Sequence, residues 1–98
     1  MDYSGLSDEI LLAKIGLHDA KALAMLYDRY ASAVLAVAMV VLRNSAAAET
    51  IVIDTFWAIW QQEGVIPIDG RSIRNRLMLL ARHLAQGVVE RVWGVESE

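Results

Sequence analysis

Apolar residues recur at spacings of three and four along most of this 98-residue chain, and this spacing predicts helices rather than strands. The longest run follows Asp19, whose side chain is typical of a helix N-cap, and continues to about Leu42. Seven residues of this run share one helical face: Leu23, Leu26, Tyr27, Tyr30, Val34, Val37 and Val41. Residues 31–42 are apolar except for Ser32, so we expect the second half of this helix to be covered on several sides.

Three further helices are predicted around it. Ser7 is a candidate N-cap for the first, which Gly16 can end in a left-handed conformation. Asn44 or Ser45 begins the third, whose inner face is Val52, Phe56, Ile59 and Trp60. Ser72 begins the fourth, with the apolar stripe Ile73, Leu77, Leu80, Ala81, Leu84 and Val88. The prediction is an all-α, compact four-helix bundle that forms one domain over residues 1–98.

Composition favours a cytoplasmic domain with a substantial core. Apolar residues make up 56% of the chain, and there is no cysteine for a disulfide framework or a thiolate metal site. The N-terminus has neither the basic segment nor the apolar segment of a signal peptide. The apolar stretch 31–42 would span about 18 Å as a helix, well short of the ~30 Å hydrocarbon core of a bilayer. We therefore expect no membrane span.

No pattern of catalytic or metal-binding residues is present. The two histidines, His18 and His83, belong to separate predicted helices, and no zinc or di-iron motif surrounds either of them. There is no glycine-rich phosphate loop. We expect no enzymatic activity, no cofactor and no metal.

Two surfaces are candidates for binding. Ile53 and Trp57 lie four apart on a face that differs from the inner face of the third helix, which suggests a partner surface. The alternative is that the loop 63–70 folds over them. The second candidate is the fourth helix, because residues 71–91 contain five arginines and one glutamate in a chain of net charge −3. A basic face of this kind can follow phosphates, although a solvated arginine-rich surface looks the same.

Two segments carry a resemblance to a known family. Residues 22–30 read ALAMLYDRY and match the pattern A-L-x-x-L-Y-x-R-Y in full, and residues 49–60 read ETIVIDTFWAIW. In this order and at this distance, the segments resemble region 2 of bacterial sigma factors, in the extracytoplasmic-function group of the sigma-70 family. Region 4, the second DNA-binding domain of such factors, is absent from these 98 residues.

The resemblance implies two functional surfaces. In the family, the third helix binds the clamp helices of the beta-prime subunit of RNA polymerase, which here corresponds to Glu49, Thr50, Ile53, Asp54 and Trp57. The fourth helix holds the melted minus-ten promoter strand, which here corresponds to Arg71, Arg74, Asn75, Arg76, Arg82, His83 and Gln86. Thr50 replaces a usual acid and Ile53 a usual glutamine, whereas His83, Gly87 and Glu90 replace an asparagine, an aspartate and an arginine.

These matches and departures leave three hypotheses. The first is a sigma-factor region 2 domain that binds core RNA polymerase and contacts promoter DNA weakly and with little sequence preference. The second is a sigma-like interaction module that binds an anti-sigma factor without recognising a promoter. The third is a helical bundle whose apolar surface is a self-interface.

Overall fold

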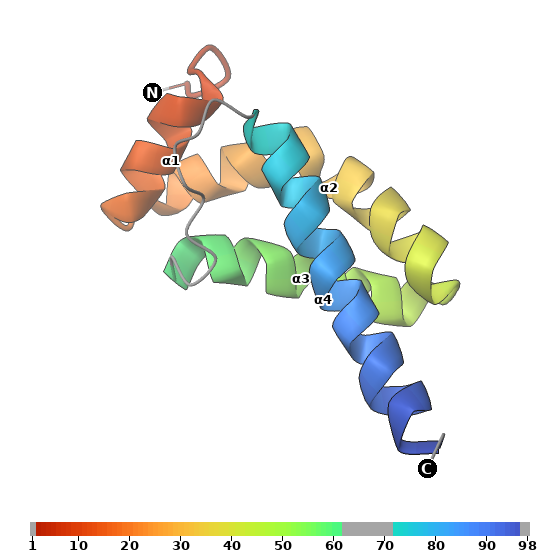
Figure 1. Ribbon diagram of the computed structural model, residues 1–98. Coiled ribbons are helices and arrows are strands. Elements are labelled where there is room, and N and C mark those ends of the chain that lie inside the picture. The colour runs from red at the N-terminus through yellow and green to blue at the C-terminus, as the bar shows by residue number, and fades with distance from the viewer. Residues whose placement is uncertain (1, 62–71, 97–98) are drawn as a thin grey trace.

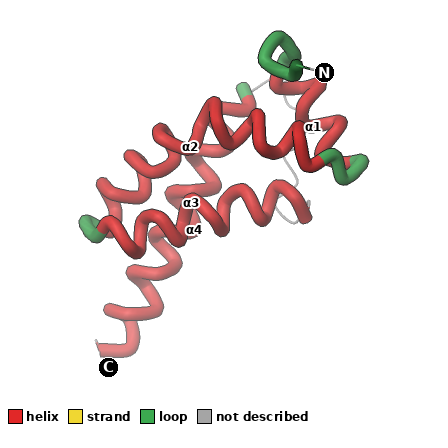
Figure 2. Tube along the Cα trace, turned by 180° about the vertical axis from the view of Figure 1, so that it is seen from behind, coloured by secondary structure: helices red, strands yellow, loops and turns green. Residues whose placement is uncertain are grey.

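The computed structural model describes residues 2–61 and 72–96, with side chains as far as residue 91, and every regular element in these ranges is an α-helix. The helices are α1 (Asp8–Gly16), α2 (Ala20–Leu42), α3 (Ser45–Gln61) and α4 (Ile73–Glu96). α2 and α3 lie side by side and run in opposite directions, α1 packs on α2, and α4 crosses the α2–α3 pair (Figure 1). Seen from behind, the last turns of α4 extend past this pair (Figure 2). The predicted all-α four-helix bundle is confirmed.

Side-chain caps begin the four helices where the sequence predicts them. The choice between Asn44 and Ser45 falls on Asn44, because its Oδ1 accepts a hydrogen bond from the Ala47 amide at 2.9 Å. Corresponding bonds join Ser7 Oγ to the Ile10 amide at 3.2 Å, Asp19 Oδ1 to the Lys21 amide at 3.0 Å and Ser72 Oγ to the Asn75 amide at 3.2 Å. Each bond satisfies an amide that has no partner within its helix.

The end of α1 differs from the prediction, because Gly16 remains within the helix. His18 takes the left-handed conformation instead, with φ 62°. Its amide donates to the Ile15 carbonyl at 2.8 Å, and the next amide, that of Asp19, donates to the Lys14 carbonyl at 3.0 Å. These two bonds form a Schellman motif, which satisfies the last carbonyls of the helix. The His18 ring also makes an edge contact with Trp60, with centroids 5.3 Å apart, and a glycine would lack this contact.

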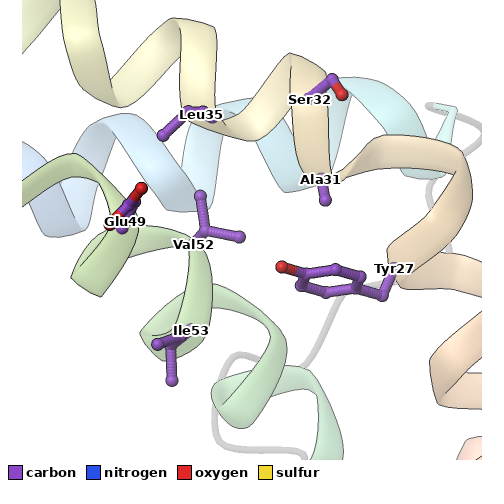
Figure 3. Close-up of a pocket in the computed structure, with 7 residues that line it drawn as sticks. All are labelled: Tyr27, Ala31, Ser32, Leu35, Glu49, Val52 and Ile53. Atoms are coloured by element: carbon purple, nitrogen blue, oxygen red, sulfur yellow. The ribbon is translucent and has the colours of Figure 1, made fainter. Parts of the chain in front are cut away.

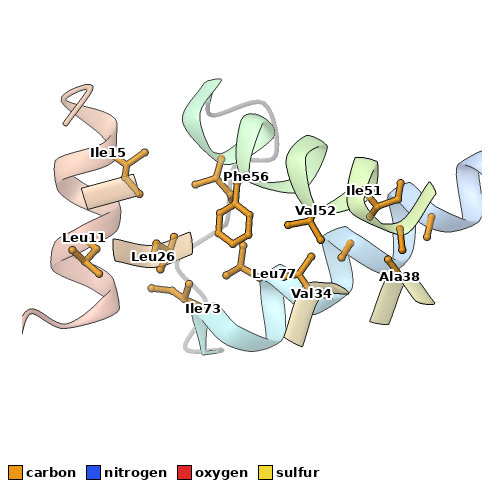
Figure 4. Close-up of a cluster of buried hydrophobic side chains, with 14 of the residues drawn as sticks. Leu11, Ile15, Leu26, Val34, Ala38, Ile51, Val52, Phe56, Ile73 and Leu77 are labelled. Atoms are coloured by element: carbon orange, nitrogen blue, oxygen red, sulfur yellow. The ribbon is translucent and has the colours of Figure 1, made fainter. Parts of the chain in front are cut away.

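The core lies where all four helices meet, around Leu26 and Phe56 (Figure 4). The largest fully buried side chains are Leu11, Ile15, Leu26, Ile51, Leu77, Val34 and Thr55. The predicted inner face of α3 is correct for three of its residues, but Trp60 is only half-buried at its edge. Ile51 and Thr55 were not predicted. The Thr55 hydroxyl is satisfied locally, since it donates to the Ile51 carbonyl at 2.7 Å.

The second half of α2 is less covered than its composition predicts. Val34 and Ala38 are fully buried, but Val40 is 76% exposed and Met39 is exposed beside it. α3 and α4 cover only part of the circumference of this helix, so part of its apolar surface faces outward. By length and composition, α2 is the one helix in the described ranges that could cross a membrane, a test that core helices of soluble proteins also pass.

A glycine inside α4 gives a stability prediction. Gly87 is helical, and a Cβ added there would meet no atom within 4 Å. Gly87→Ala should therefore stabilise the domain by about 1 kcal/mol, because alanine loses less backbone entropy in a helix. The measurement is a thermal melt, with an expected rise of about 4–8 °C. The control is Gly5→Ala, which has equal space but lies outside any helix; a larger gain from the control would contradict the explanation.

Candidate partner-binding and nucleic-acid surfaces

The outer face of α3 combines two large apolar side chains with two carboxylates. Ile53 is 64% exposed and Trp57 is 55% exposed, one helical turn apart. Glu49 and Asp54 are exposed on the same side of the helix, and so is Thr50. The Thr50 hydroxyl donates to the Ala46 carbonyl of its own helix at 3.2 Å. The five residues predicted to face a partner therefore form one exposed surface, named here the α3 face.

The helical repeat of α3 explains why Ile53 and Trp57 are exposed. Val52 and Phe56 point into the core, which turns positions 53 and 57 outward by about 100° per residue. The alternative, that the loop 63–70 covers Ile53 and Trp57, concerns a segment outside the described residues.

A shallow groove of ≈ 430 Å³ borders the α3 face on the side of α2. Its lining residues are Tyr27, Ala31, Ser32, Leu35, Glu49, Val52 and Ile53 (Figure 3). The Tyr27 ring is held against Phe56, with centroids 5.0 Å apart, and Figure 3 shows its hydroxyl directed toward α3. Glu49 and Ile53 belong both to the groove and to the α3 face, so the two form a continuous surface with an apolar base and a carboxylate at its edge.

The basic residues of α4 do not form a single patch. Arg74, Asn75, Arg82, His83 and Gln86 are exposed, whereas Arg76 is half-buried with its Nη2 atom inside the fold. Arg74 and Arg82 are eight positions apart, which is about 12 Å along a helix. Leu79 lies between them and is 53% exposed. Arg71, the seventh predicted residue, lies outside the described residues.

Arg82 and His83 also border different hollows. Arg82 and Gln86 line a groove against the second half of α2, and His83 lines another with Gly87, Glu90 and Arg91. The α2–α4 groove was not predicted from the sequence. The sequence signal for this groove is the apolar run of residues 31–42. That run predicts a helix covered on several sides, whereas the structure leaves Val40 and Met39 exposed.

Arg29 and Tyr30, which end the motif of residues 22–30, hold the N-terminal segment in place. Arg29 Nη1 lies 2.8 Å from Asp8 Oδ1 in a partly buried ion pair, and Nη2 donates to the Ser4 carbonyl at 2.9 Å. The Tyr30 hydroxyl donates to the other oxygen of Asp8. Tyr3 is fixed in turn, because its hydroxyl donates to Asp19 Oδ2 at 2.7 Å. This part of the motif therefore contributes to the fold, in that it ties residues 3–8 to α2.

The same bonds predict how stability depends on pH. The hydrogen bond from Tyr3 lowers the pKa of Asp19 below 3.8, and the bond to Asp8 raises the pKa of Tyr30 above 10.0. The pKa of Tyr3 is also raised, chiefly by its bond to Asp19. A lowered carboxyl pKa stabilises the fold above pH 3.8, and this stabilisation is lost as the pH falls through the folded value. A raised tyrosine pKa stabilises it below pH 10.0, and this is lost as the pH rises through the folded value.

We expect the melting temperature to fall below about pH 4 and above about pH 10, with a plateau between. Circular dichroism melts from pH 2 to 11 measure this dependence. Tyr3→Phe and Tyr30→Phe together should flatten the alkaline fall while lowering the plateau, because their hydroxyl bonds are lost. An alkaline fall of unchanged size in this double variant would show that other groups cause it.

No group of three or more metal-ligating side chains occurs in the part of the chain that the structure describes. Comparisons of the chain with protein-family models, with curated proteins and with solved structures give no match. The candidate binding surfaces of the described chain are therefore the α3 face, the two grooves and the exposed arginines of α4.

Proposed function

We propose that this chain is a sigma-factor region 2-like domain of the cytoplasm, without enzymatic activity. It binds core RNA polymerase through the α3 face and contacts the melted minus-ten promoter strand through α4. The observation that carries the proposal is the exposure of Ile53 and Trp57 beside Glu49 and Asp54, on the helix that the resemblance assigns to the beta-prime clamp helices. Large apolar side chains on a small domain often mark a partner surface, and tryptophan is enriched among the residues that dominate binding energy.

The charge of the α3 face specifies what its partner should offer. Glu49 and Asp54 are carboxylates, and no lysine or arginine lies on the face within the described chain. A partner helix with an apolar stripe and a basic side chain beside it would match both features. The groove next to Tyr27 could accept one apolar side chain of such a helix.

The direct test is a titration of an isolated clamp-helix fragment of the beta-prime subunit against the 98-residue protein by calorimetry. We expect saturable binding at one site per domain. A small anti-sigma domain is titrated in parallel, since it is the partner expected by the second hypothesis. Absence of heat with the clamp fragment, together with saturable binding of the anti-sigma domain, would reject the polymerase proposal.

The second candidate is a sigma-like module that binds an anti-sigma factor without recognising a promoter. The arrangement of α4 favours it: Arg76 is half-buried, Leu79 interrupts the basic surface, and Arg74 and Arg82 are separated along the helix. A strand held by these residues would find few phosphate contacts and few groups that select bases.

Binding of single-stranded DNA distinguishes the two candidates. Three phosphate contacts from Arg74, Arg76 and Arg82 would give a slope of log affinity on log salt of about −2, at about 0.7 per contact. With Arg76 half-buried, two contacts remain, so we expect a slope of about −1.4 and weak binding that depends little on base sequence. Fluorescence anisotropy of labelled minus-ten and scrambled oligonucleotides measures both properties. Tight binding that prefers the minus-ten strand would contradict this expectation, and no binding at ~20 mM salt would favour the anti-sigma module.

A further inference from the structure

The α2–α4 groove is an apolar feature of the described surface that lies outside the α3 face. It has a volume of ≈ 360 Å³ and is lined by Val37, Val40, Val41, Met78, Leu79, Arg82 and Gln86. Val40 is 76% exposed and Leu79 is 53% exposed, so apolar side chains form both walls without being covered. Two crossing helices supply these walls, so the groove is open to solvent rather than an enclosed cavity.

The one charged side chain among the described lining residues of this groove is the cation Arg82. No aspartate or glutamate is among the described lining residues. Two acids on the neighbouring elements line other hollows: Glu90 borders the hollow beside His83, and Glu49 borders the groove beside Tyr27.

We propose that the α2–α4 groove docks an amphipathic helix of another protein, whose apolar stripe is flanked by aspartate or glutamate. The stripe fills the trough between Val40 and Leu79 in the manner of helix-in-groove recognition, with anchors at positions i, i+3 or i+4, and i+7. The acidic flank meets Arg82, which sets the orientation of the helix. This docking site is distinct from the α3 face, and it shares Arg82 and Gln86 with the surface of α4 that is proposed above to contact DNA.

A second copy of this chain and a membrane surface are two other possible occupants of the groove, and both fit the charges of the protein less well. A second copy of this chain related by two-fold symmetry would bring two Arg82 side chains into one small contact, where like charges repel. A membrane would need a broad protruding apolar face, and an anionic bilayer surface would meet a protein whose net charge is −3. A single docked helix interacts mainly with the charges at the rim of the groove. Negative charges elsewhere on the protein that lie farther away than about 8 Å are screened at physiological salt.

The experiment uses the 98-residue protein and fluorescein-labelled helical peptides of about 18 residues. One panel has leucine, isoleucine or methionine anchors at helical spacing with glutamate flanks, and a matched panel has lysine flanks. Anisotropy titrations should give saturable binding for at least one glutamate-flanked peptide, at least about fivefold tighter than for its lysine counterpart. Val40→Asp should weaken this binding at least about tenfold, because it places a carboxylate where the apolar stripe docks.

Charge reversal tests the orientation that Arg82 sets. Arg82→Glu should invert the preference, so that the lysine-flanked peptide binds more tightly. Lys21→Glu is the matched control, since it makes the same change in net charge on an exposed residue at the other end of α2 and should leave the preference unchanged. Circular dichroism checks that each variant remains folded.

Three results would overturn the proposal. The first is equal binding of the two panels to the unaltered protein, or binding of neither at millimolar concentration. The second is a dimer in sedimentation velocity that Val40→Asp dissociates, because the groove would then be a self-interface. The third is binding to phosphatidylglycerol vesicles that Val40→Asp removes, because the surface would then be a membrane contact.

Discussion

Replacement of Phe56 by alanine should destabilise the domain by about 3–5 kcal/mol, the loss typical of a large aromatic truncated in a packed core. Phe56 is 4% exposed, and its ring lies 5.0 Å from that of Tyr27 between centroids. Leu26 and Leu77 lie on its other sides (Figure 4). The truncation would therefore leave a cavity where α2, α3 and α4 meet, and an aromatic contact would be lost as well.

Urea unfolding followed by far-ultraviolet circular dichroism measures this loss. A domain of this size is stable by roughly 5–15 kcal/mol, so the variant should be close to unfolding at 37 °C. The neighbouring substitution Trp57→Ala is the control, because its side chain is half-exposed and should cost under about 1 kcal/mol. Trp60→Ala should fall between them, since Trp60 is half-buried and packs on His18. Equal losses at positions 56 and 57 would mean that the assignment of inner and outer faces of α3 is wrong.

The largest effect on binding is expected from Trp57→Ala. If the α3 face is the contact surface, removal of its largest side chain should weaken partner binding by about 2–4 kcal/mol, or roughly 30-fold to 1000-fold. The melting temperature should change little, because Trp57 is 55% exposed in the free domain. Calorimetric titration with the clamp-helix fragment, and with an anti-sigma domain, measures the change for each candidate partner.

Ile10→Ala is the matched control for this prediction. Ile10 is 46% exposed on α1, so the substitution removes a similarly exposed apolar side chain outside the α3 face. Its partner affinity should equal that of the unaltered protein. A loss of stability in Trp57→Ala without any loss of affinity would show that Trp57 serves the fold and that the partner binds elsewhere.

Local sequence patterns were sufficient for the elements themselves. Asp19 and Ser72 are caps whose geometry depends on the next three residues, and the spacing of Val52, Phe56 and Ile59 determines which side of α3 is buried. For the same reason the sequence places Ile53 and Trp57 together on a face other than the inner one, since two residues one turn apart share a face whatever the rest of the chain does. The five residues of the α3 face therefore form one surface, as their spacing alone requires.

Tertiary packing decided which apolar side chains are buried, because burial depends on which helix covers them. Val40 and Val34 are equally apolar in sequence, but α3 and α4 cover only the side of α2 that carries Val34. The α2–α4 groove and its arginine rim exist because two helices far apart in sequence meet there. The left-handed His18 at the end of α1 is likewise accompanied by a ring contact with Trp60, more than forty positions along the chain. Periodicity specifies the face of a helix, whereas burial depends on the neighbours that the whole fold brings to that face.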